Sequence, residues 1–82
     1  MVFRKLTQFE KRRVREIFGR HGITQQILYY PFIRKLIEKK DITRSDLEEC
    51  IEENVRKGLD REVLEELARA LKPDLWTRRC LS

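Results

Sequence analysis

The chain has 82 residues, of which 40% are charged and 40% hydrophobic, and its formal net charge is +5. This length accommodates a single domain over residues 1–82, and the composition excludes a disordered chain and favours a helix-rich fold. Residues 1–40 hold eleven Lys and Arg against three acids, whereas residues 41–82 hold eight against eleven. We therefore expect a basic half that faces a polyanion and an acidic half that faces solvent, a protein partner or a second copy.

Membrane insertion and secretion are not expected from this sequence. The longest apolar run, ILYYPFI at residues 27–33, has seven residues, far fewer than the ~20 that a membrane-spanning helix needs. The N-terminal stretch MVFRKLTQFEKRR contains no apolar signal-peptide core, so we expect a cytoplasmic protein. In that compartment Cys50 and Cys80 are expected to be reduced thiols.

Four helices are predicted, at about residues 8–20, 25–39, 44–57 and 61–72. Each is preceded by a residue whose side-chain oxygen can accept a hydrogen bond from a first-turn amide. These predicted N-caps are Thr7, Thr24, Thr43 and Asp60. Gly22 and Gly58 are predicted to end the first and third helices in the left-handed conformation. The sequence therefore predicts an all-α fold, a compact bundle of four main helices.

Apolar residues at helical spacing define the expected core. The expected inward-facing residues are Val14, Ile17, Phe18, His21, Leu47, Cys50, Ile51, Val55, Val63, Leu64, Leu67, Ala68 and Leu71. Pro31 interrupts the second helix, because it lacks an amide proton and clashes with the carbonyl group of Ile27. That helix is therefore either kinked or split, with the second part beginning at Pro31. After Pro73, Leu75 and Trp76 are expected to pack on the bundle.

The stretch IFGRHGITQQIL, residues 17–28, resembles a helix-turn-helix DNA-binding domain over about residues 13–30. The matching features are an apolar residue in the first helix, a glycine at the turn, an apolar residue followed by a cap, and an aliphatic residue in the second helix. They are found at Ile17, Gly22, Ile23, Thr24 and Leu28. Three residues depart from the family's pattern, which has a small residue, an exposed side chain and an unbroken helix at these positions: Phe18, Ile27 and Pro31.

The resemblance implies that the second helix enters the major groove of DNA and that the first crosses the backbone. Glutamine can pair bidentately with adenine, and Lys and Arg hold phosphates. The predicted DNA-binding residues are Lys11, Arg12, Arg13, Arg15, Arg20, Thr24, Gln25, Gln26 and Tyr29. The first hypothesis is therefore a small protein that binds double-stranded DNA, with transcriptional regulation as its role. Charge alone does not separate DNA from RNA.

A second hypothesis arises from a repeat in the chain. The stretch RHGIT at 20–24 recurs as RKGLD at 56–60, where it leads into the acidic REVLEELARAL. Two helical hairpins of similar design explain this repeat without DNA. The protein is then a helical adaptor or inhibitor that binds a partner protein through the apolar segment Ile27–Ile33. Its expected contacts are Tyr29, Tyr30, Phe32 and Ile33.

The sequence gives less support to sliding-clamp binding and to catalysis. QQILYYPF partly resembles the sliding-clamp-binding motif, with Gln25, Leu28 and Phe32 in place but Pro31 where an aromatic residue belongs. Catalysis is not expected, because the chain has no phosphate-binding glycine loop and no nucleophile elbow. A single histidine, His21, and two distant cysteines predict no metal site. We expect no cofactor and no small-molecule substrate.

Overall fold

The computed structural model describes residues 6–75, and the regular secondary structure within them consists of α-helices and one short 3-10 helix. The elements are α1 (Gln8–Arg20), η1 (Gln26–Tyr29), α2 (Tyr30–Glu38), α3 (Arg44–Arg56) and α4 (Arg61–Leu71). The predicted bundle of four main helices is confirmed, and α1, α3 and α4 end within one residue of their predicted bounds. The expectations for Trp76 and Cys80 lie outside the described residues.

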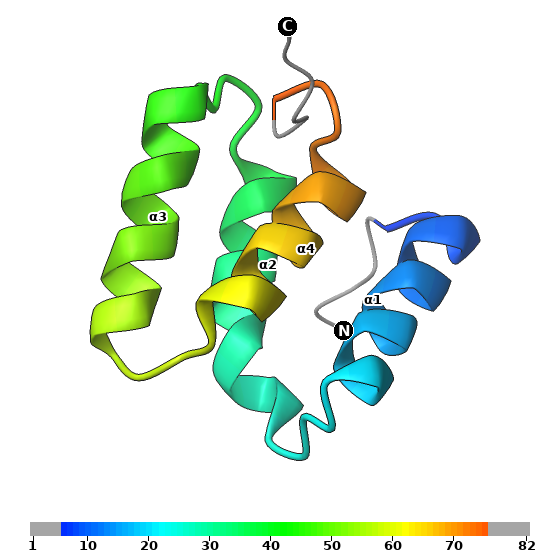
Figure 1. Ribbon diagram of the computed structural model, residues 1–82. Helices are drawn as coiled ribbons and strands as arrows, with labels where there is room; N and C mark the ends of the chain where they lie inside the picture. The colour runs from blue at the N-terminus through cyan, green and yellow to red at the C-terminus, as the bar shows by residue number, and fades with distance from the viewer. Residues whose placement is uncertain (1–5, 76–82) are drawn as a thin grey trace, which may run out of the picture.

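Helix α4 is the centre of the bundle and packs against α1, α2 and α3. Figure 1 shows α3 and α1 on opposite sides of the α2–α4 pair. All five predicted core positions of α4 are buried, as are Val14, Ile17 and Phe18 of α1. In α3 Val55 packs against the core as predicted but is only partly buried, and Asn54, which is absent from the predicted core, is buried as well. The Asn54 side-chain amide donates to the Cys50 carbonyl oxygen at 2.7 Å, which satisfies it inside the core.

Two helices begin with reciprocal capping boxes, at the predicted N-caps Thr7 and Thr43. The Thr7 hydroxyl accepts from the Glu10 amide at 3.1 Å, and the Glu10 carboxylate accepts from the Thr7 amide at 3.0 Å. Thr43 and Asp46 make the same pair of bonds at the start of α3. Hydrogen bonds from the Thr43 backbone amide and then from the Lys39 ammonium lower the pKa of Asp46. These local bonds explain why both helix starts could be predicted.

The second helix is split, and the predicted cap at Thr24 is wrong. Thr24 is exposed, and the helical backbone starts two residues later, as the 3-10 turn η1, with no side-chain cap on its first amides. Pro31 then lies in the first turn of α2. Amides in a first turn make no hydrogen bond within the helix, so the missing amide proton of proline costs nothing there. Leu28, at the position where the helix-turn-helix pattern has a buried aliphatic residue, is 49% exposed, since the 3-10 turn does not place it on the core face.

Candidate nucleic-acid interface

The outward face of α1 carries the predicted phosphate-binding residues. Arg12 and Arg15 are exposed and Lys11 is partly exposed, and the three lie within an arc of about 100° around the helix axis. Among the described residues, no ion pair joins any of the three to an acid. We call Lys11, Arg12 and Arg15 the cationic face of α1. Their charges are available to an external anion.

Arg13 and Arg20 point to different surroundings. The Arg13 guanidinium lies 5.8 Å from the centroid of the exposed Phe9 ring, a cation–π contact that leaves its hydrogen-bond donors open. Arg20 was predicted to hold DNA, but its guanidinium is bonded to the Glu66 carboxylate of α4 at 2.6 Å. The same carboxylate lies 2.9 Å from Nε2 of the partly buried His21. Arg20 and His21 therefore join α1 to α4.

Tyr29 is buried, so its predicted contact with DNA is wrong. Its ring packs on Phe18 with the centroids 5.7 Å apart, and its hydroxyl accepts a hydrogen bond from the Asp60 amide at 3.0 Å. Phe18 stands where a helix-turn-helix has a small residue, and its ring supplies the apolar surface that draws Tyr29 inward. The tyrosine connects α1 and η1 with the start of α4.

Residues 24–28, which we call the tip, are an exposed segment made of the end of the first turn and the first three residues of η1. Thr24, Gln25 and Gln26 are exposed, in accord with the expectation for the two glutamines. Ile27 and Leu28 are 69% and 49% exposed. The tip follows the C-terminal end of α1 (Figure 1). Polar amides and two aliphatic side chains thus occupy the position predicted for the first turn of a recognition helix.

The protein-binding segment expected at residues 27–33 does not form a continuous surface. Phe32 and Ile33 are 1% and 0% exposed, because both face the core from the first turns of α2. With Tyr29 also buried and Tyr30 only partly exposed, the predicted partner contacts at Tyr29, Phe32 and Ile33 are wrong. The burial of Phe32 also removes the aromatic anchor that the sliding-clamp resemblance requires.

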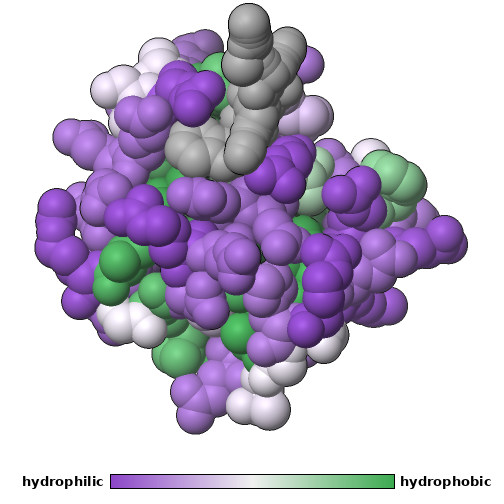
Figure 2. Space-filling view, viewed as in Figure 1, coloured by the Kyte–Doolittle hydropathy of each residue, from purple (hydrophilic) through white to green (hydrophobic). Residues whose placement is uncertain are grey.

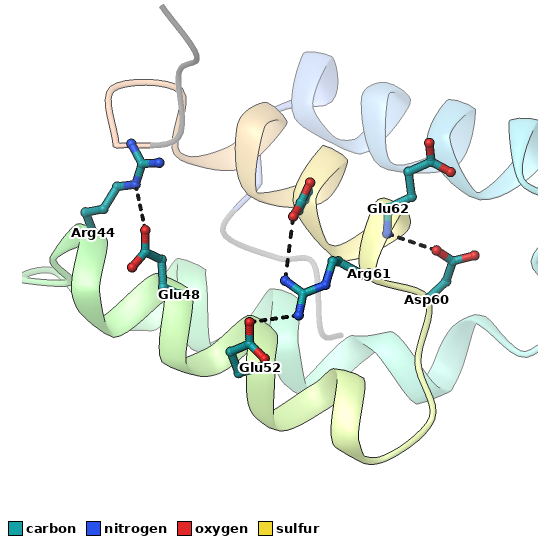
Figure 3. Close-up of polar contacts among 7 residues, drawn as sticks. Arg44, Glu48, Glu52, Asp60, Arg61 and Glu62 are labelled. Carbon is teal, nitrogen blue, oxygen red and sulfur yellow. Dashed lines mark hydrogen bonds and ion pairs between the residues drawn. The ribbon is translucent and has the colours of Figure 1, made fainter. Parts of the chain in front are cut away.

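The opposite side of the bundle is acidic, and many of its charges are already paired (Figure 3). Arg44 pairs with Glu48 at 3.3 Å along α3. Arg61 of α4 reaches Glu52 of α3 at 2.8 Å, and the hydrogen bond and charge of Glu52 raise the pKa of Arg61. An open hollow of about 350 Å³ lies here, lined by Ser45, Glu48, Glu49, Ile51, Glu52 and Arg61. Its excess of acids would repel a polyanion.

Among the described residues there is neither a metal-binding cluster nor a membrane-spanning helix. In residues 6–75, no group of three or more His, Cys, Asp or Glu side chains could hold a metal ion. None of the helices described has the length and apolar content that crossing a membrane requires. Figure 2 shows a mainly hydrophilic face with small, separate apolar patches.

No protein-family model, curated protein or solved structure matches the chain.

Proposed function

We propose that the chain binds duplex DNA, with α1 along the phosphate backbone and the tip in the adjacent groove. The observation that carries this proposal is the set of unpaired cations on α1. Lys11 and Arg15 are one helical turn apart, about 6 Å along the axis, so that both can contact neighbouring phosphates of one strand. Each contact that replaces a condensed counterion contributes to affinity.

The charge distribution supports the same orientation. Most of the acidic residues lie in α3 and α4, while residues 17–37 contain no acid at all. A duplex approaching α1 therefore meets positive charge and the uncharged tip, and it avoids the acidic hollow between α3 and α4. This one-sided arrangement favours a single binding face. The protein-binding alternative retains only Ile27 and Leu28 as exposed aliphatic contacts, fewer than a stable protein interface uses.

A salt titration tests the proposal. Wild-type protein is titrated into a labelled duplex at several salt concentrations, and the slope of log affinity against log salt is measured. Replacing Lys11, Arg12 and Arg15 by Ala should weaken binding and flatten the slope by roughly 0.9 for each phosphate contact removed. The matched control replaces Arg44, Arg69 and Lys72, which removes the same charge from the acidic half and should change the slope little. Absence of duplex binding at low salt would contradict the proposal.

A further inference from the structure

The tip holds two neighbouring aliphatic side chains out into solvent on a support that is anchored at both ends. At its start, the Ile23 amide donates to the Phe18 carbonyl oxygen at 2.9 Å. At its end, Tyr29 is buried and its hydroxyl accepts a hydrogen bond from the backbone amide of Asp60. Within the tip, the Leu28 amide donates to the Gln25 carbonyl oxygen at 3.2 Å. Ile27 and Leu28 are thus presented outward by a braced turn.

The surroundings of these two side chains suit a polyanion with an apolar interior. No acid occurs between Glu16 and Glu38, so the tip itself carries no charge that would repel phosphates. Of the acids in contact with its flanks, Glu66 is paired with Arg20, and the backbone amide of Asp60 meets Tyr29. Gln25 and Gln26 place uncharged donors and acceptors directly before Ile27. These side-chain amides can form hydrogen bonds with base edges in a groove. In the hydrocarbon of a membrane they would lose their bonds to water and find no other partner. The tip therefore fits DNA better than a lipid surface.

We propose that Ile27 and Leu28 act as a wedge that enters the minor groove of duplex DNA and kinks it. This inference rests on the duplex binding proposed above. Proteins that bind the minor groove insert Ile or Leu between base pairs, while Gln, Arg and Lys hold the groove around them. A protruding aliphatic pair is suited to separating two stacked bases.

The test is a bending measurement with the whole chain. A duplex about 30 base pairs long carries a donor and an acceptor dye at its ends, and energy transfer is followed as protein is added. Wild-type protein should increase the transfer, in line with a kink of about 20–90°. The double variant Ile27→Ser/Leu28→Ser should still bind with an unchanged salt slope but should lose the increase. Both positions are exposed, so thermal unfolding should show an intact fold.

A matched control and a competitor sharpen the result. Phe9→Ser removes another exposed apolar side chain, 64% exposed near the start of α1, and should leave the bend unchanged. A small ligand that occupies the minor groove should reduce bending by the wild type. Binding without bending, or equal bending by the double variant, would overturn the wedge and leave duplex binding intact. Absence of duplex binding, or binding to anionic phosphatidylglycerol vesicles in its place, would overturn both proposals.

Discussion

The two glycine turns of the molecule begin alike. Gly22 and Gly58 both have left-handed backbones, with φ of 64° and 99°. In each turn the residue after the glycine donates its amide to the carbonyl oxygen five positions earlier, Ile23 to Phe18 at 2.9 Å and Leu59 to Asn54 at 3.1 Å. Both helices therefore end in the same hydrogen-bonded C-terminal motif.

The turns differ in how the next helix starts. In the second turn Asp60 caps α4 at once, its carboxylate accepting from the Glu62 amide at 2.9 Å. In the first turn Thr24 caps nothing, and the chain passes through the tip before α2 begins. The same pattern of a glycine, an apolar residue and a potential cap ends a helix in both turns, but it starts the next helix only in the second. The first turn is left with an exposed loop at the C-terminal end of α1 (Figure 1).

The largest loss of stability should come from removing the contact between Phe18 and Tyr29, which holds the first turn. Phe18→Ala removes a ring that is 1% exposed and the surface on which Tyr29 packs, so it should cost about 3–5 kcal/mol of unfolding free energy. Chemical denaturation measures this loss. Tyr29→Phe keeps the ring and removes only its bond to Asp60, and should cost about 1 kcal/mol. A loss under 1 kcal/mol for Phe18→Ala would show that the first turn is not held by this contact.

The glycines should behave equally in the two turns. Gly22→Ala and Gly58→Ala should each destabilise by about 1–2 kcal/mol, because an L side chain is strained at positive φ. An added Cβ meets no atom within 4 Å at either site, so backbone conformation alone sets the cost. Gly19, inside α1, is the control: its Cβ also meets open space, and Gly19→Ala should stabilise by about 0.5–1 kcal/mol. Unequal losses at Gly22 and Gly58 would break the equivalence of the turns.

Removing the residue at the cap position should lower the unfolding free energy in the second turn but not in the first, and this is the smallest of the expected effects. Asp60→Ala removes a bond to a first-turn amide of α4 and should cost about 1 kcal/mol. Thr24→Ala should change the unfolding free energy by less than about 0.5 kcal/mol, as at an ordinary exposed position. Thr43→Ala, at the start of α3, serves as a second authentic cap and should resemble Asp60→Ala. Equal losses at Thr24 and Asp60 would mean that Thr24 caps a helix after all.

The features that the sequence predicts correctly are those that depend on near neighbours. Thr7, Thr43 and Asp60 bond amides two or three residues away, and Gly22 and Gly58 adopt the conformation that glycine tolerates. Local pattern therefore defines the ends of α1, α3 and α4. The helix interiors follow from apolar spacing, which a central helix such as α4 satisfies fully.

The candidate site could be predicted only in part, because several of its residues depend on distant partners. Arg20 is bound to Glu66, 46 positions later, and Tyr29 to the amide of Asp60, 31 positions later. Neither pairing has a local signal. The aromatic Phe18 and the proline at 31 did indicate that the second helix would depart from a helix-turn-helix. They did not indicate that Leu28 would face solvent.

We propose that one surface, made of the cationic face of α1 and the tip, contacts duplex DNA. The most direct measurement is a nuclear magnetic resonance titration of isotope-labelled protein with a short duplex, following each backbone amide. We predict that the perturbed amides cluster at Lys11–Arg15 and Gln25–Leu28, while Glu48, Glu49 and Glu52 on α3 stay unchanged. Perturbations confined to α3, or none at a salt concentration low enough for phosphate contacts to form, would contradict the claim.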